Sequence, residues 1–257
     1  MRMTTRSLSI TALPGVPPVR PGDDLCGLVI KAVAAGGFLL EDGDVVVLAQ
    51  KIVSKSEGRQ VALAQVTPSR AAVKLAEDCG KDPRLVELIL SETDEIMRVR
   101  PNILIVRHRL GLVLANAGID QSNIEAADGP QALLLPVDPD ASAAKLRADL
   151  RAATGKTVAV LIIDSLGRAW RLGTMGTAIG VAGLPAVLDL RGQPDLNGRK
   201  LESSELGLAD EVAAAASLAM GQAAEGTPIV LVRGLDLAAD GSTARTLVRP
   251  RDVDLFP

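Results

Sequence analysis

The chain contains very few aromatic residues: two Phe, one Trp and no Tyr among 257 residues. Proteins that bind single-stranded DNA or RNA stack the bases on aromatic side chains, so that class of partner is disfavoured. Basic residues are not in excess either, because the formal net charge is -3 and the sequence pI is about 5.3. No nucleic-acid partner is therefore expected. The core must be built mainly from Ala, Val, Leu and Ile, since 47% of the residues are hydrophobic.

Cysteines and long apolar runs are also scarce. Cys26 and Cys79 lie far apart and match no metal-ligand spacing, so two buried free thiols in a reducing compartment are expected. No stretch reaches the roughly 20 apolar residues of a membrane-spanning helix. The basic N-terminal residues are followed by no apolar signal core. These absences predict a soluble cytoplasmic protein without a membrane partner.

Strand-like and helix-like segments alternate irregularly along the chain. This pattern predicts an α+β (mixed α/β) fold and not a regular doubly wound sheet. We expect strands at 8–12, 45–49, 158–163 and 228–232, and a hairpin that pairs 103–106 with 112–114. We expect helices at 25–35, 67–76, 82–93 and 141–154, and a long alanine-rich helix capped by Ser203 or Ser204 that ends at Met220. The length fits one domain over residues 1–257, with room for two subdomains.

The tetrapeptide Thr154-Gly155-Lys156-Thr157 resembles the end of a Walker A loop but lacks its context. The full motif requires a glycine where Leu150 stands, and it leads from a strand into a helix. Here a predicted helix precedes the tetrapeptide and a predicted strand follows it. We therefore interpret it as a helix stop, and any nucleotide site must use another loop.

The most informative segment is 162–171, where an apolar strand ends in Asp164 and Ser165, followed by Arg168 and Arg171. Carboxylate and hydroxyl oxygens are the ligands that Mg²⁺ and Mn²⁺ prefer. Guanidinium groups pair well with phosphate or carboxylate oxygens. The segment therefore suggests a site for a metal-bound phosphate.

A second segment, 116–123, has the same character. It follows a strand-like stretch and presents Asp120, Ser122 and Asn123 together. Both aspartates also have a structural explanation, because Asp120 could form an Asx turn and Asp164 could cap the loop after its strand. The two segments together nevertheless favour a site for a divalent metal and a charged substrate.

Several other polar residues are ambiguous from the sequence alone. Lys55 could face a phosphate or be simply solvated. Trp170, the only tryptophan, could pack under its loop or stack on a flat ligand. His108, the only histidine, is expected at the surface near a turn, and Asp210-Glu211 is expected on an exposed helix face.

With these motifs in this order, the sequence resembles the F420 gamma-glutamyl ligase family (coenzyme F420-0:L-glutamate ligases). The resemblance covers nearly the whole chain, up to about Gly234. The resembling stretches are ALPGV (12–16), EDGDVVVLAQKIVSKSEGR (41–59), NAGIDQSN (116–123), LLLPVDPDASAAKLRADL (133–150), IIDSLGRAWRLGTMGTAIGVAGL (162–184), DLNGRKL (195–201), LADEVAAAASLAMGQ (208–222) and PIVLVRG (228–234).

The resemblance implies a GTP-dependent ligase that acts in F420 biosynthesis. Such enzymes transfer the γ-phosphate of GTP to the carboxylate of F420-0, and the α-amine of L-glutamate attacks the acyl phosphate. The products are an amide, GDP and phosphate, and Mg²⁺ or Mn²⁺ together with K⁺ is used. The resemblance also implies a fold unlike that of P-loop proteins and an intertwined homodimer. The C-terminal reductase-like domain of some relatives is not expected in 257 residues.

The resemblance assigns roles to individual residues as well. Asp120 and Asp164 match metal-binding aspartates of the catalytic centre, and Ser165 matches a third metal ligand. Gln222 stands where some relatives carry Glu, and an amide is a weaker ligand than a carboxylate. From its place after Asp164-Ser165, and not from the resemblance, Arg168 is the catalytic cation expected to hold anionic substrate. The positions expected to bind nucleotide are Leu13, Pro14, Gly15, Val16, Gln50, Lys51, Lys55, Asn123, Met220 and Gly221.

Two other functions remain open from the sequence. The unusual loop 172–176 suggests a paralogous GTP- or ATP-dependent amino-acid ligase that acts on another cofactor carboxylate. A nucleotide-binding regulator without turnover is the third hypothesis. The presence of both Asp120 and Asp164 argues against the regulator, because metal ligands matter most to catalysis.

Overall fold

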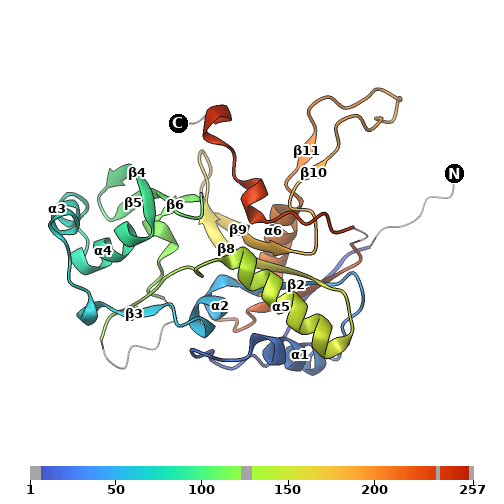
Figure 1. Cartoon of the computed structure of the whole chain (residues 1–257), viewed down its shortest axis with the longest axis horizontal. Coiled ribbons are helices and arrows are strands. Elements are labelled where there is room, and N and C mark those ends of the chain that lie inside the picture. Colours follow the sequence, from blue (N-terminus) through green and yellow to red (C-terminus); the bar gives the residue numbers. More distant parts are fainter. Residues whose placement is uncertain (1–6, 123–128, 236–237, 255–257) are drawn as a thin grey trace.

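The centre of the molecule is a five-stranded sheet (Figure 1). The computed structural model describes residues 7–122, 129–235 and 238–254. The strand order is β1-β12-β2-β8-β9, in which β2 and β8 are parallel and all other neighbours are antiparallel. The five strands are β1 (Ser9–Ala12), β12 (Ile229–Arg233), β2 (Val45–Ala49), β8 (Ala159–Gly167) and β9 (Thr174–Ala182). The mixed sheet confirms the predicted α+β class.

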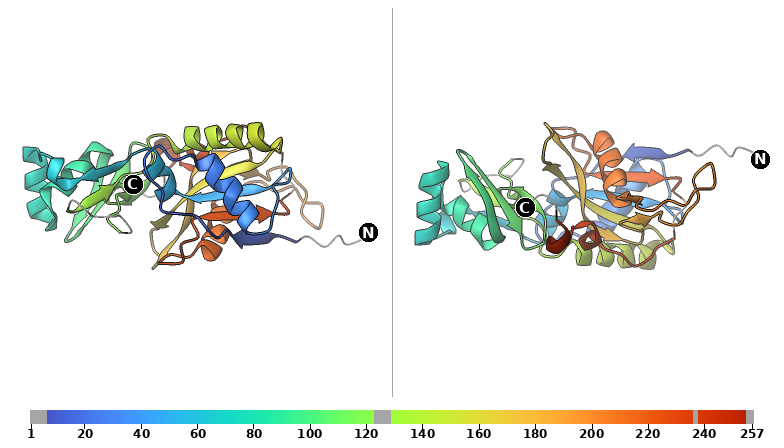
Figure 2. Two further views of the ribbon diagram at one scale, coloured as in Figure 1. Left: turned by 90° about the horizontal axis from the view of Figure 1, so that it is seen from below. Right: turned by 90° about the horizontal axis from the view of Figure 1, so that it is seen from above.

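Helices cover both faces of this sheet (Figure 2). Helices α1 (Leu25–Ala35) and α5 (Pro139–Thr154) lie on one face, and α6 (Leu208–Met220) lies on the other. Alternate residues of β8 accordingly point into two separate cores, with Ile162 in the first and Leu161 in the second. Because both faces are buried, β2 and residues 159–163 of β8 are continuous apolar runs and not alternating ones.

A smaller group of elements lies at one end of the sheet (Figure 1). Its core is formed where two helices pack on a three-stranded antiparallel sheet. These elements are α3 (Arg70–Cys79), α4 (Pro83–Ser91), β4 (Thr93–Arg100), β5 (Ile103–His108) and β6 (Val113–Ala115). The two-stranded pair β3 (Gln60–Ala62) and β7 (Gln131–Leu133) leads the chain into this group and back.

The remaining elements are short. They are α2 (Gln50–Ser56), the hairpin β10 (Leu188–Asp189) and β11 (Glu205–Leu206), and the 3-10 helices η1 (Leu63–Gln65), η2 (Asn116–Gly118), η3 (Ala244–Leu247) and η4 (Arg251–Val253). None of the helices in the described part of the chain is both long and apolar enough to cross a membrane.

Several predictions from local patterns are confirmed. Helix 25–35 and strand 45–49 have the expected bounds, and the hairpin around Arg109-Leu110-Gly111 forms between β5 and β6. Gly155 ends α5 in the left-handed conformation and β8 follows, so the Walker-like tetrapeptide is a helix stop.

Four predictions are wrong in part or in full. Helix α6 begins at Leu208, after Gly207, so neither Ser203 nor Ser204 caps it. The reason is that the residues between these serines and the helix, Glu205–Leu206, form strand β11 and pair with β10. Cys26 is only partly buried, although Cys79 is buried as expected. Of the pair on α6, Glu211 is exposed but Asp210 is half-buried, where its Oδ1 accepts a hydrogen bond from the Ala178 amide.

His108 was expected at the surface, but its side chain is completely buried. Its Nδ1 accepts a hydrogen bond from the Leu110 amide, so the neutral ring carries its proton on Nε2. That nitrogen lies 3.3 Å from Oε2 of Glu92. The tight β5–β6 turn therefore folds the ring inward, toward a buried carboxylate.

Glu92 is the centre of an ionic network that joins the smaller group of elements to the rest of the molecule. Its Oε1 lies 2.7 Å from Arg59 Nη2, and its Oε2 lies 2.9 Å from Arg109 Nε. The two arginines also donate to the backbone carbonyls of Leu135 and Val137, respectively, just before α5. One carboxylate thus fixes three segments that meet at this junction.

This network makes acid stability depend on Glu92. Burial alone would raise its pKa, but His108, Arg59 and Arg109 hold the pKa at about 2, below the usual 4.5. A depressed pKa gives stability that is present above the unfolded-state value and is lost as the pH falls through the folded-state value. We expect the free energy of unfolding to fall between about pH 5 and pH 2. Urea titrations across this range should show a weaker pH dependence for Glu92→Gln, and an unchanged slope would contradict the assignment.

Gly180 allows α5 to approach β9 closely. A Cβ at this position would overlap the backbone carbonyl of Pro139, which cannot move without displacing the start of α5. Gly180→Ala is therefore expected to destabilise the fold by about 1–3 kcal/mol through overpacking. Thermal unfolding measures this loss. Gly167→Ala is the control, because nothing lies within 4 Å of the corresponding Cβ.

Candidate active site

Two of the predicted site segments leave the sheet side by side. Strands β2 and β8 are parallel, with Ala49 paired to Ile163. The next residues are Gln50-Lys51 after β2 and Asp164-Ser165 on β8, so both pairs come to the same end of the sheet. Ends of neighbouring parallel strands are a common place for a binding site in α/β sheets.

Two further segments meet at this end. The Leu13 amide donates to the carbonyl of Ile229, and the Ala49 amide donates to that of Pro228, each at 2.9 Å. The loop 13–16 after β1 therefore starts next to the end of β2. Ser165 Oγ donates to Gln222 Oε1 at 2.5 Å, which brings the segment 220–222 after α6 to the end of β8.

Asp120 reaches the site from the other group of elements. Its backbone pairs with Leu133 through two hydrogen bonds of 3.0 and 2.8 Å. Its Oδ2 lies 2.5 Å from Lys51 Nζ, and Lys51 also donates to Ser122 Oγ at 3.0 Å. Asp120 Oδ1 accepts a hydrogen bond from the Ser122 amide at 2.7 Å, which is the expected Asx turn. One carboxylate oxygen thus stabilises the turn and the other faces a cation.

The two aspartates are electrostatically coupled. Burial raises the pKa of Asp164 to about 6, and the negative charge of Asp120 adds to this effect against the Ser165 amide and Lys51. Burial also acts to raise the pKa of Asp120, but Lys51 and Ser122 hold it below its usual value. A shifted carboxylate pair with only one nearby lysine is a place where additional positive charge is favourable.

The oxygen atoms at this end fit a divalent cation that is shared with a substrate. Asp120, Asp164, Ser165 and Gln222 supply hard oxygen donors, and the Lys51 ammonium takes the place of a cation beside Asp120. Among the described residues no group of three His, Cys, Asp or Glu side chains could hold a metal. Mg²⁺ commonly binds one or two carboxylates and completes its shell with phosphate oxygens and water, so the donor set suits a metal–nucleotide complex.

The other predicted nucleotide residues have different surroundings. Gln50 is buried, and its Oε1 accepts a hydrogen bond from Ser54 Oγ at 2.8 Å, so its amide is engaged inside the chain. Lys55 lies one helical turn after Lys51 on α2 and is partly buried. Met220 is buried, while Gly221 adopts a positive φ of 77° at the end of α6. Asn123 lies outside the described residues.

Arg168, Trp170 and Arg171 lie on the loop between β8 and β9 and are exposed. Trp170 is 89% exposed and has a positive φ of 64°, so it does not pack under its loop. Arg168 makes no ion pair with the described residues. The loop thus presents an unpartnered aromatic ring and two guanidinium groups, which leaves stacking on a flat ligand as the remaining alternative for Trp170.

A second polar group, not predicted from the sequence, surrounds one cavity and consists of Arg109, Arg245, Asp138 and Asp140. Arg109 and Arg245 are far apart in the sequence, and no local motif connects them. Only the fold brings them together.

The comparisons with known proteins identify the family of the chain. Residues 15–234 match the model of the family described as F420-0:Gamma-glutamyl ligase. A protein named coenzyme F420:L-glutamate ligase from Methanothermobacter thermautotrophicus is 48% identical over 252 residues, which cover 97% of this chain and 98% of the relative. A protein with the same name from Methanopyrus kandleri is 44% identical over 97% of this chain and 98% of its own length. One from Methanocaldococcus jannaschii is 42% identical over 85% of this chain and 86% of its own. The chain therefore belongs to the F420-0:gamma-glutamyl ligase family.

Proposed function

We propose that the protein is a GTP-dependent ligase that joins L-glutamate to the carboxylate of coenzyme F420-0 through an acyl phosphate. The family membership supports the reaction class. The observation that carries the proposal is the meeting of Asp120, Asp164 and Lys51 where β2 ends beside β8, next to the loops that are proposed to bind nucleotide. Two acids and a lysine are suited to a metal-bound triphosphate.

The reaction has two steps in this proposal. A carboxylate oxygen of F420-0 attacks the γ-phosphorus of GTP, and GDP leaves with the electrons of the broken P–O bond. The glutamate nitrogen then attacks the acyl carbon and loses a proton, while the C–O bond breaks and phosphate leaves. No nucleophilic side chain is required in either step.

The residues of this chain bind and orient the reactants. Lys51 and Lys55, on one face of α2, pair with phosphate oxygens, and the loop 13–16 contacts the nucleotide. Asp120, Asp164 and Ser165 would hold Mg²⁺ or Mn²⁺, with Gln222 as an additional oxygen donor. The bound ion supplies positive charge that stabilises the transferring phosphoryl group. K⁺ as a second cation and an intertwined homodimer belong to the same proposal.

The loop between β8 and β9 is proposed to bind the acceptor. F420-0 has a flat deazaflavin ring and a phosphodiester. The exposed ring of Trp170 can stack on a flat heterocycle, and Arg168 and Arg171 can pair with phosphate or carboxylate oxygens. The loop begins after Gly167, two residues beyond Ser165, so an acceptor held there can place its carboxylate near the proposed phosphate site.

The test is a reconstituted reaction with GTP, Mn²⁺, K⁺, L-glutamate and F420-0. Mass spectrometry is expected to detect F420 with an added glutamate, together with one GDP for each amide bond formed. Parallel reactions with ATP measure nucleotide preference. The absence of both GDP and adduct would refute the proposal. GDP release with a different carboxylate acceptor, and none with F420-0, would favour the paralogous ligase instead.

A further inference from the structure

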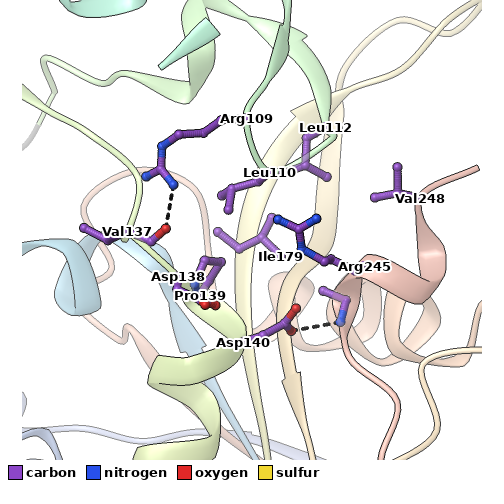
Figure 3. A pocket seen from close by; sticks show the side chains of 11 residues that line it. Arg109, Leu110, Leu112, Val137, Asp138, Pro139, Asp140, Ile179, Arg245 and Val248 are labelled. Atoms are coloured by element: carbon purple, nitrogen blue, oxygen red, sulfur yellow. Dashed lines mark hydrogen bonds between the residues drawn. The ribbon is translucent and has the colours of Figure 1, made fainter. Parts of the chain in front are cut away.

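A cavity of about 210 Å³ lies between the β5–β6 turn, the start of α5, strand β9 and the 3-10 helix η3 (Figure 3). Its apolar wall is formed by Leu110, Leu112, Ile179 and Val248. Drug-sized ligands occupy pockets of roughly 300–1,000 Å³. The cavity is therefore too small for a guanine nucleotide or a deazaflavin, and it suits a small metabolite.

Charged groups of both signs line this cavity. Arg245 points into it from η3 and forms no ion pair with the described residues (Figure 3). Arg109 enters from the opposite side, where Nε is bound to Glu92 and Nη1 to the carbonyl of Val137. Asp138 and Asp140 line the floor at the start of α5.

Each aspartate uses one oxygen to shape the cavity. Asp138 Oδ1 accepts a hydrogen bond from the Ala141 amide and so caps the start of α5. Asp140 Oδ1 accepts hydrogen bonds from the amides of Val181 and Ala244, both at 2.8 Å. These two bonds hold η3 against β9. This second contact fixes the segment that carries Arg245. The cavity is thus a built feature that three distant parts of the chain maintain.

The cavity lies close to the proposed phosphate site. Ile179 is an extra residue in β9, because Gly180 pairs with Ile162 while Ala178 pairs with Ile163. Such a bulge redirects side chains and is common beside active sites. Thr177 is the strand partner of Asp164. Ile179 lies two residues further along β9, which corresponds to a distance of about 7 Å along the strand. Ile179 also belongs to the core on the α1 and α5 face, together with Leu166 of β8.

We propose that this cavity binds the free amino-acid substrate. The inference rests on the proposed ligase function and assigns its amino-acid subsite. A cavity that is lined by both guanidinium groups and carboxylates matches a zwitterion. Arg245 binds a carboxylate of the amino acid, Arg109 lies beside its second acidic group, and Asp138 and Asp140 face the ammonium. The proposal also explains residues 137–140, which have no other assignment in the proposed function: they form one wall of the amino-acid subsite.

Arg245→Gln tests the subsite. The side chain is exposed and has no ion pair with the described residues, so the variant is expected to fold normally. Calorimetric titration with L-glutamate, in the presence of Mn²⁺ and a non-hydrolysable GTP analogue, should give a Kd at least tenfold higher than that of the wild type. The KM for glutamate should rise equally, with the KM for GTP unchanged. Arg249→Gln, four residues away and also exposed, is the matched control and should bind normally.

Asp138→Asn provides an independent variant, because asparagine keeps the helix cap but removes the charge that faces the ammonium. It too should weaken glutamate binding.

Equal glutamate affinity in the wild type and Arg245→Gln, or no saturable binding to the wild type, would overturn the subsite. If the wild type forms the glutamyl adduct and Arg245→Gln keeps its KM, the subsite fails and the ligase function stands. If glutamate binding depends on Arg245 but no adduct forms, the subsite stands and the ligase function fails.

Discussion

Asp164→Asn is expected to lower kcat by at least about a hundredfold. The proposed metal contributes several kcal/mol of charge stabilisation in phosphoryl transfer, and each 1.4 kcal/mol is about tenfold in rate. Asparagine preserves the shape of the side chain but removes the negative charge that the ion requires. Single-turnover GDP formation measured with saturating GTP and Mn²⁺ isolates the chemical step from product release.

The fold should survive this change. Burial raises the pKa of Asp164 to about 6, above its usual 3.8, so the ionised side chain destabilises the metal-free protein at pH 7. Asp164→Asn should therefore unfold at the same temperature as the metal-free wild type or at a higher one. Asp252→Asn, at an exposed position on η4, is the matched control and should keep full activity. Normal turnover in Asp164→Asn would reject the metal role.

Glu92→Ala is expected to destabilise the protein by about 3–5 kcal/mol. Removal of one partner from a buried ionic network leaves the other charges desolvated and unpaired. Here two arginines would lose their common acceptor, and the buried His108 would lose the carboxylate that it faces. For a chain of this size the loss corresponds to a fall in Tm of about 10 °C. Differential scanning calorimetry and urea unfolding both measure it.

Glu95→Ala is a closely matched comparison. Glu95 lies three residues further along and also contacts two arginines, Arg107 at 3.5 Å and Arg251 at 2.6 Å, but 45% of its side chain is exposed. Surface ion pairs contribute about 0–1 kcal/mol. A similar loss of stability in both variants would show that burial does not determine the effect, and would contradict our description of Glu92.

The predictable parts of this fold are those with short-range signals. Helix 25–35 has an apolar run ended by two glycines, and the strand that leads to Asp164 is long and uninterrupted. The motifs predicted Asp120 and Asp164 as two halves of one site, but they placed Asp164 at the end of its strand, whereas β8 continues to Gly167. Strand β4 escaped detection because its residues are largely charged and exposed.

The residues that the sequence misplaced depend on distant partners. His108 lies between two arginines, which suggested exposure, but its burial is determined by Glu92 sixteen positions earlier. The cavity at Arg245 joins residues more than a hundred positions apart. Neither hydrophobic periodicity nor turn chemistry carries information on such contacts, since both describe neighbours along the chain.

The position of β12 has a consequence for synthesis on the ribosome. This strand is nearly the last element of the chain, yet it lies between β1 and β2, which are among the first. A nascent chain that has not reached residue 229 holds β1 and β2 with unpaired edges, and such edges invite pairing with other chains. The loop 13–16 after β1 also cannot take its place until β12 arrives, because Leu13 is anchored to Ile229. The proposed site can therefore form only after β12 has been translated, and until then the unpaired strand edges are open to contacts with other chains.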